Sequence, residues 1–231
     1  MTIRCMKSAT PVVCVAMLVC LFTLGAPPAS ADSFTFDLGT GNSAISGFPG
    51  PYATVTVDRT DSTHATITFT SLTNSGNIYL MGDGGTVGVN VDATSWTLSG
   101  ITGSNAGTGF TAGGPFSDGG SGNEDGFGSF NQTINTFDGF SHSSDTISFT
   151  LTDTSGTWAD AASVLTPNDG GSEAAAHIFV TSFPANQANG ALATGFAANG
   201  GPVSSPEPSS LGMLGIGALG LLGFARRRLL A

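Results

Sequence analysis

The chain has 231 residues, of which 34 are glycine and 10% carry charge, and its formal net charge is −10. A chain of this length suits one modest domain with flanking segments. From Asp32 to Ser205 there are 15 acidic side chains against 1 basic one, Arg59, which gives a net charge of −14 with the histidines neutral. Nucleic acids and anionic lipids are bound by clustered lysine and arginine, so this composition excludes both as partners of the middle of the chain.

Residues 1–31 are predicted to be a secretory signal peptide. Arg4 and Lys7 precede an apolar run at 12–24, and the A-x-A sequence of Ala29 and Ala31 is a signal peptidase site. The apolar run is shorter than the roughly 20 residues that a spanning helix needs. We therefore expect export through the Sec translocon and cleavage by signal peptidase after the last of these residues. All three cysteines lie in the removed segment, so the mature chain would contain none.

The middle of the chain alternates apolar and polar residues with a period of two, which is the pattern of half-buried β-strands. The clearest cases are 52–58 and 65–70, which we expect to form a hairpin with Asp61 and Ser62 in its turn. About nine or ten short strands with glycine-rich turns predict an all-β fold, either an antiparallel β-sandwich or a jelly roll. The remaining predicted strands are 34–38, 77–81, 86–91, 95–99, 127–134, 145–151 and 176–183, and short helices are predicted only at 160–165 and 172–176.

The same pattern predicts the core and the domain limits. We expect the ectodomain to span 32–189, a length that can bury a sufficient core without disulfides. A flexible spacer rich in alanine, glycine and asparagine is predicted at 190–205. Trp96 and Trp158 are interpreted as packing groups rather than as platforms for sugar rings. The side chains expected on the core-facing side of their strands are Ile67, Phe69, Ile147, Phe149 and Leu151.

Residues 100–126 are dense in glycine and break the alternation, so we predict a long loop there, with a single strand near Phe110 as an option. The acidic end of this loop carries oxygen ligands of the kind that calcium takes, although their spacing does not match an EF-hand. Two interpretations stay open, a calcium site and a solvated acidic loop. The candidate calcium ligands are Asp118, Asn123, Glu124 and Asp125.

No motif selects catalytic residues. Phosphate-binding loops need a basic residue beside their glycines, and the G-x-S-x-G elbow of hydrolases is absent. His64, His142 and His177 are scattered rather than set at metal-ligand spacing. We interpret the last of these as a hydrogen-bonded structural residue. A pair of carboxylates or a Ser-His-Asp set brought together by folding stays open, but we expect a protein that is not an enzyme and that has no cofactor apart from the calcium option.

Residues 206–231 consist of three parts in a fixed order. The apolar stretch at 211–225 would extend about 22 Å as a helix, which just spans a thin bilayer. We therefore predict a single transmembrane helix there. Arginine clusters stay on the cytoplasmic side of a membrane, which places the other end of the helix outside. The residues on the two sides of the helix are Pro206, Glu207 and Pro208 before it, and Arg226, Arg227 and Arg228 after it.

This tail resembles that of the PEP-CTERM proteins of Gram-negative bacteria, which is read by the membrane-embedded transpeptidase exosortase. The resemblance implies that the Pro-Glu-Pro triplet at 206–208 is the recognition and processing site and that the arginines at 226–228 stop transfer. A valine often precedes the motif in this family, whereas this chain has Ser205. Residues 174–180 and 195–197 are similar to a segment near the end of many such ectodomains, which implies membership but no chemistry.

These features predict an exported protein that is tethered to the inner membrane by its C-terminal helix and, after exosortase processing, reaches the cell surface or the medium. In the family such substrates are linked with exopolysaccharide and biofilm, which implies a non-enzymatic surface or matrix role with exopolysaccharide as a partner. One alternative is a carbohydrate-binding module, calcium-dependent if the acidic loop binds the ion. The other is a secreted glycan hydrolase.

Overall fold

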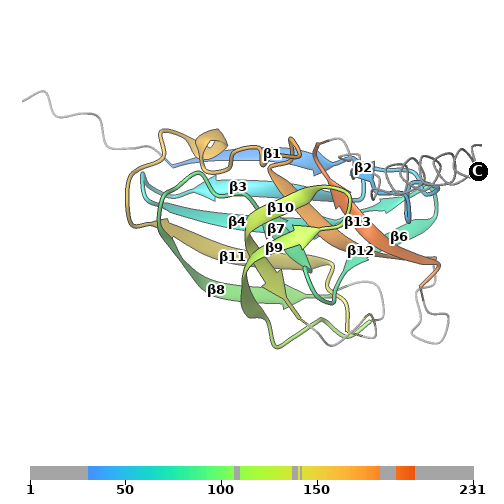
Figure 1. Cartoon of the computed structure of the whole chain (residues 1–231). Helices are drawn as coiled ribbons and strands as arrows, with labels where there is room; N and C mark the ends of the chain where they lie inside the picture. Colours follow the sequence, from blue (N-terminus) through green and yellow to red (C-terminus); the bar gives the residue numbers. More distant parts are fainter. Residues whose placement is uncertain (1–30, 107–109, 137–139, 141, 183–190, 201–231) are drawn as a thin grey trace, which may run out of the picture. The chain divides into compact units, whose positions relative to one another are not determined.

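The computed structural model describes residues 31–106, 110–136, 140, 142–182 and 191–200 (Figure 1). The predicted transmembrane helix and nearly all of the predicted signal peptide lie outside these residues. Within the described ranges, no helix is long and apolar enough to cross a membrane. The described residues form antiparallel β-sheets, and all nine strands predicted from the alternation are present.

The first sheet has five antiparallel strands in the order β1-β3-β4-β11-β8 (Figure 1). The predicted hairpin joins β3 to β4, and the carboxylate of Asp61 in its turn accepts hydrogen bonds from the backbone N–H groups of Thr63 and His64. Along β3, β4 and β11, buried apolar residues alternate with partly or fully exposed polar ones. The strands are β1 (Asp32–Leu38), β3 (Ala53–Arg59), β4 (His64–Ser71), β11 (Thr146–Asp153) and β8 (Trp96–Ser104).

The second sheet follows the order β2-β13-β12-β7-β10-β9, and β6 pairs with both β12 and β5. Its long central strand, β12, pairs with β13, β6 and β7. The strands are β2 (Thr40–Gly41), β5 (Thr73–Asn74), β6 (Asn77–Met81), β7 (Val87–Val89), β9 (Ser117–Glu124), β10 (Gly128–Asn135), β12 (Ala174–Ser182) and β13 (Ala193–Ala198).

Both sheets contribute to one apolar core, the arrangement of a β-sandwich. The five side chains predicted to be in the core are all buried. Trp158 is also buried, and its indole N–H donates to the carbonyl of Asp92 at 2.8 Å. Trp96 is half-buried, packs against the same core and donates to the Gln132 side chain at 3.0 Å. Both tryptophans therefore pack as predicted.

The two predicted helices have different outcomes. A 3-10 turn at Ala161–Ser163, capped by Asp160, lies within the first of them. The second, 172–176, is wrong, because Ala174 begins β12 and the alanines there pair with β7. Sheet pairing in this position overrides the helix propensity of alanine, which is a weak determinant by comparison.

The predicted loop at 100–126 is also corrected. Strand β8 continues to Ser104, and the glycine-rich segment Ser117–Glu124 forms β9, an edge strand paired with β10. Glycine is required on β9 because a Cβ atom at Gly119 or Gly122 would collide with the Thr133 side chain of β10. No strand forms at Phe110, which is buried against Phe179 with a ring-centroid distance of 5.5 Å.

The predicted spacer at 190–205 is shorter than the composition suggests. Residues 193–198 form β13, which pairs with β12 over six residues. Ala197 and Ala198 are buried on opposite faces of the sheet, so the fold extends at least to this point. Seven residues, 199–205, lie between the end of β13 and the Pro-Glu-Pro triplet.

Candidate functional site

The predicted processing residues fall almost entirely outside the described part of the chain. Ala29, the Pro-Glu-Pro triplet at 206–208 and the arginines at 226–228 lie outside it, and Ala31 is its first residue. Asp32, the expected first residue of the mature chain, begins β1. Its Oδ1 atom accepts from the Arg59 Nε atom at 2.7 Å, and its Oδ2 atom accepts from the backbone N–H of Ala161 at 2.8 Å.

The structure does not gather the four candidate calcium ligands at one point. Asp118 and Glu124 stand near opposite ends of β9, about 20 Å apart along an extended strand. Asp118 accepts from Gln132 and from the N–H of Gly120, while the carboxylate of Asp125 accepts from Asn42 and Asn123 pairs with Ser129 of β10. Among the described residues, no group of three or more His, Cys, Asp or Glu side chains could hold a metal ion.

Glu124 has a different and unexpected environment. Its side chain is fully buried, and neither carboxyl oxygen has a hydrogen-bond partner among the described residues. The carboxyl group packs where Gly85 and Gly88 have no side chains, next to the ring of Phe130. Burial raises the pKa of Glu124 from its ordinary value of 4.5 to about 8, so the group is mostly protonated at neutral pH. A lone glutamate beside a glycine turn carries no sequence signal for burial.

His177 is held by aromatic rings and by one backbone carbonyl. Its Nδ1 atom donates to the carbonyl of Gly84 at 3.1 Å, since a carbonyl can only accept. The imidazole stacks on Phe196 with a centroid distance of 4.3 Å, and Phe140 contacts it edge-on at 5.2 Å. Burial lowers the pKa of His177, an effect that the Gly84 carbonyl and the charge of Asp83 partly offset. The predicted hydrogen bond of this histidine is confirmed.

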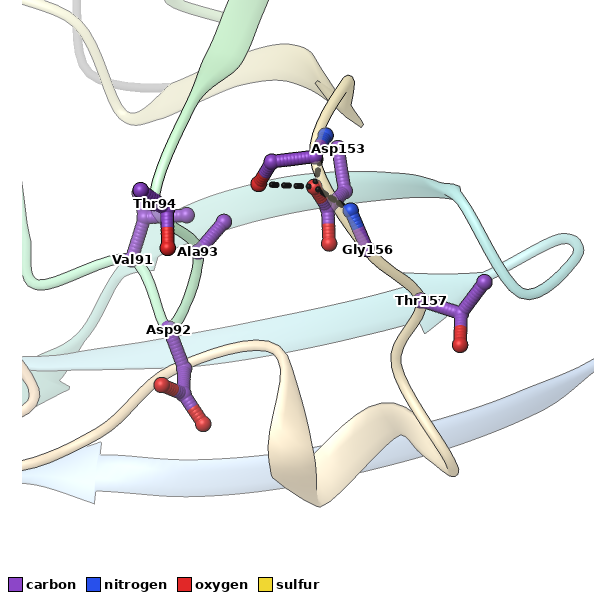
Figure 2. Close-up of a pocket in the computed structure, with 8 residues that line it drawn as sticks. Val91, Asp92, Ala93, Thr94, Asp153, Gly156 and Thr157 are labelled. Carbon is purple, nitrogen blue, oxygen red and sulfur yellow. Dashed lines mark hydrogen bonds between the residues drawn. The ribbon is translucent and has the colours of Figure 1, made fainter.

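A polar hollow of about 380 Å³ lies where the segment after β7 meets the end of β11 (Figure 2). The Asp153 Oδ1 atom accepts from the N–H and hydroxyl of Ser155 and from the N–H of Gly156. Burial alone would raise the pKa of Asp153, but these hydrogen bonds outweigh it and lower the pKa. The lining residues are Val91, Asp92, Ala93, Thr94, Asp153, Ser155, Gly156 and Thr157.

The hollow offers hydroxyl and carboxylate groups and no basic or aromatic side chain. A general acid in glycoside hydrolysis needs a carboxyl group with a raised pKa, whereas the pKa of Asp153 is lowered. The lowered pKa makes Asp153 unsuited to the role of such an acid. Sequence reasoning missed the hollow because Asp92 and Asp153 are far apart in the chain and belong to no motif.

The comparison with known protein families matches residues 206–228 to the PEP-CTERM protein-sorting motif. Comparison of the chain with curated proteins and with solved structures found no match. The match covers the Pro-Glu-Pro triplet, the apolar stretch and the arginine cluster, which are the residues on which the resemblance rested. The chain therefore carries a PEP-CTERM sorting signal, which implies export, exosortase as its processing partner, and a location at the cell surface or outside the cell.

Proposed function

We propose that this protein is a non-enzymatic component of the bacterial surface or extracellular matrix, which associates with exopolysaccharide after exosortase has removed its tail. The proposal rests on one observation, that the sorting motif at 206–228 follows an all-β domain in the sequence. The motif supplies the route out of the cell. The β domain is the part that remains after processing, so the surface or matrix role has to come from the chemistry of this domain.

The position of the domain relative to the motif supports this route. The seven residues at 199–205 can extend over at most about 25 Å, because each adds no more than about 3.6 Å. A tail held in the membrane would thus keep the sandwich close to the membrane surface. Removal of the tail would leave β13 and its pairing with β12 in the released domain.

The start of the fold supports cleavage by signal peptidase after Ala31. Asp32 is already in β1, opposite Arg59 of β3, and both of its carboxylate oxygens are hydrogen-bonded. A mature chain beginning at Asp32 would therefore keep every strand of the first sheet. We propose the Sec translocon and signal peptidase as the partners in this first step, and a membrane-tethered intermediate before the second.

The composition of the domain supports exopolysaccharide as a partner. The domain has one basic residue and many serines and threonines, so its surface offers neutral hydrogen-bonding groups rather than positive charge. Such a surface can bind neutral glycans and repels anionic ones. Biofilm association would follow from the same contacts.

The test is the intact mass of the protein recovered from an exosortase-containing host, for the wild type and two variants. We expect the wild type to begin at Asp32 and to end near Pro206–Pro208, and we expect Glu207→Ala to retain the tail and stay in the membrane fraction. Asp169→Ala, which removes an exposed carboxylate elsewhere, is the matched control and should be processed normally. Normal release of Glu207→Ala would contradict the proposal.

The second candidate function is that of a carbohydrate-binding module. The polar hollow between Asp92 and Asp153 favours it. If binding is calcium-dependent, millimolar calcium should raise the melting temperature and a chelator should reverse the rise. A hydrolase would instead release product from the host's own exopolysaccharide. Product release would overturn the non-enzymatic assignment, whereas retention on the glycan without product would support it.

A further inference from the structure

The exposed face of the five-stranded sheet is covered almost entirely by hydroxyl groups. Three rows of outward-facing residues cross all five strands in the order β1, β3, β4, β11, β8. None of the fifteen residues is buried. Thirteen are threonine or serine, and the other two are aspartates. The central row is Thr35, Thr56, Thr68, Ser148 and Thr102, and the flanking rows are Asp37, Thr54, Thr70, Thr146 and Ser104, and Ser33, Asp58, Thr66, Thr150 and Ser99. We call this surface the hydroxyl face.

Neighbouring hydroxyls on this face lie within hydrogen-bonding distance of each other across the strands. The oxygen–oxygen distance is 3.0 Å between Thr68 and Ser148 and 3.1 Å between Thr35 and Thr56. A hydroxyl has one donor and two acceptor sites, so each of these groups keeps hydrogen-bonding capacity for an external partner after contacting its neighbour. These hydroxyl pairs fix the positions of the oxygen atoms and leave part of their hydrogen-bonding capacity unused.

The face also has a small hollow at its β8 edge. Thr102, Ser104, Thr146 and Ser148 surround a volume of about 110 Å³, with Gly103 between the first two. The first two residues lie on β8 and are the register partners of Ser148 and Thr146 on β11. Four hydroxyl-bearing residues therefore line one concave point on the face, next to the register shift between Ser148 and Thr150 in the β11–β8 ladder.

Charge and shape limit what this face can bind. Strands lie about 4.8 Å apart and alternate residues about 6.7 Å apart along a strand, so the three rows cover roughly 19 by 13 Å. The rows contain no lysine, arginine, glutamate or aromatic residue, and both aspartates belong to β1 and β3. An anionic polymer would be repelled by these aspartates and by the net charge of the domain. A neutral polymer with many hydroxyl groups would meet donors and acceptors in every row.

Threonine is common on exposed strands because its branched side chain favours the β conformation. That preference explains threonine but not the absence of longer charged side chains from all three rows. Sheets usually carry lysine or other charges on exposed edge strands, where these oppose edge-to-edge aggregation. On this sheet the edge strand β8 contributes only serine and threonine to the rows. Lysine is absent from all of residues 32–205, so what distinguishes this face is the density of its hydroxyl groups.

We propose that the hydroxyl face is the surface through which the protein binds a neutral polysaccharide chain. This inference rests on the proposed function and assigns the exopolysaccharide contact to a particular surface. Sheet twist amounts to about 20–25° per strand, so five strands turn through roughly 80–100°. A rigid planar lattice such as ice cannot match all three rows on a surface twisted in this way. A single flexible glycan chain can follow the twist from row to row.

The test uses the processed protein from an exporting host in native gels that contain dextran, galactomannan or hydroxyethyl cellulose as neutral glycans, or alginate as an anionic one. The face variant combines Thr56→Val, Thr68→Val and Ser148→Ala, which remove three hydroxyls of the central row and keep residues that suit a strand. The matched control combines Thr73→Val and Thr194→Val, which remove two exposed hydroxyls from strands of the second sheet, away from the hydroxyl face. A third variant, Thr94→Val with Thr157→Val, tests the hollow at Asp92 and Asp153 as an alternative site. Thr68→Val alone serves if the triple variant has a lowered melting temperature.

We expect at least one neutral glycan to retard the wild type and alginate to have no effect. The loss of three hydrogen bonds should weaken the affinity of the face variant about tenfold or more, while the control keeps wild-type affinity. Equal retardation of the face variant and the wild type would overturn the assignment. Retardation lost only in the Thr94 and Thr157 variant, no retardation by any neutral glycan, or ice-crystal shaping without glycan binding would overturn it as well.

The same preparations separate this inference from the proposed function. Intact mass reports whether exosortase has processed each variant, and gel retardation reports glycan binding. A face variant that is processed normally but binds less glycan supports both. A wild type that is processed normally but binds no neutral glycan contradicts the face assignment and leaves the sorting route in place. A wild type that keeps its tail contradicts the proposed function itself.

Discussion

Asp32 and Arg59 join the first residue of β1 to the last residue of β3. The Asp32 Oδ1 atom lies 2.7 Å from the Arg59 Nε atom, and the two residues are register partners in the β1–β3 ladder. Arg59 is only 4% exposed and is the single basic residue between Asp32 and Ser205. The residue that follows the predicted cleavage site therefore supplies a carboxylate to the buried guanidinium group of the domain.

Replacement of Asp32 should destabilise the domain. Asp32→Ala removes the carboxylate that faces a buried charge, and a hydrogen bond to a charged group contributes about 1.5–3 kcal/mol. The Asp32 side chain is 37% exposed, so solvent screening reduces the expected loss to about 1 kcal/mol. Thermal unfolding of the mature protein would measure it. Asp37→Ala, an exposed aspartate on the same strand, is the control, and equal melting temperatures for the two variants would contradict the prediction.

Glu124 predicts an unusual pH dependence of stability. Its carboxyl group holds a proton in the folded state up to about pH 8, whereas in the unfolded chain it loses the proton near 4.5. The folded state then binds more protons than the unfolded state between these values, so the free energy of unfolding falls as pH rises from about 4.5 to about 8. Each pKa unit corresponds to about 1.4 kcal/mol, so the contribution is several kcal/mol.

Glu124→Gln removes this titration while keeping the size of the side chain. We expect the difference in free energy of unfolding between variant and wild type to change steadily in favour of the variant from about pH 4.5 to about 8, and to stay constant above that. Urea unfolding at a series of pH values would measure it, with Asp169→Asn as a control at an exposed carboxylate. A difference that does not depend on pH would show that Glu124 is charged or solvated in the folded protein.

The place of β13 in the fold can be tested with a charge. Ala197 is fully buried in the shared core, so Ala197→Asp should destabilise the domain by about 3 kcal/mol or more or prevent folding, because an unpaired buried charge is costly. Thr194→Asp, at an exposed position of the same strand, should change the stability by less than about 0.5 kcal/mol. Soluble yield and melting temperature give the comparison. Similar yields and melting temperatures for both variants would mean that residues 193–198 belong to a spacer and not to the folded domain.

The sequence predicts the strands with a clear alternation, since each of them buries one face. Ile147, Phe149 and Leu151 are an example, because their spacing of two residues places all three in the core. The hydroxyl face follows from the same alternation, but its rows depend on strand order and register. These bring Thr56, Thr68 and Ser148 together only after folding.

The sequence analysis missed four strands, of which β2 and β5 have only two residues each, and the two longer ones, β9 and β13, lack such a pattern. Strand β9 consists of polar residues and glycines, and only the close approach of Thr133 shows why glycine is needed there. Half of strand β13 is alanine, so it resembles a linker in composition, although its alanines fill space between larger core residues. Burial of Glu124 depends on the absence of side chains at Gly85 and Gly88, which is a property of the folded chain.

The short connection between β13 and the sorting motif should limit processing by exosortase. Deletion of residues 201–204 would leave three residues between Ala198 and Pro206, with a reach of only about 10 Å, so the folded domain would collide with the membrane or the enzyme. We expect the processed fraction, measured by intact mass, to fall severalfold while the melting temperature of the domain stays unchanged. Insertion of four glycine and serine residues after Gly201 is the matched control and should leave processing at the wild-type level, because a longer flexible connection keeps the motif accessible. Normal processing of the deletion variant would mean that exosortase reaches its site without clearance from the domain.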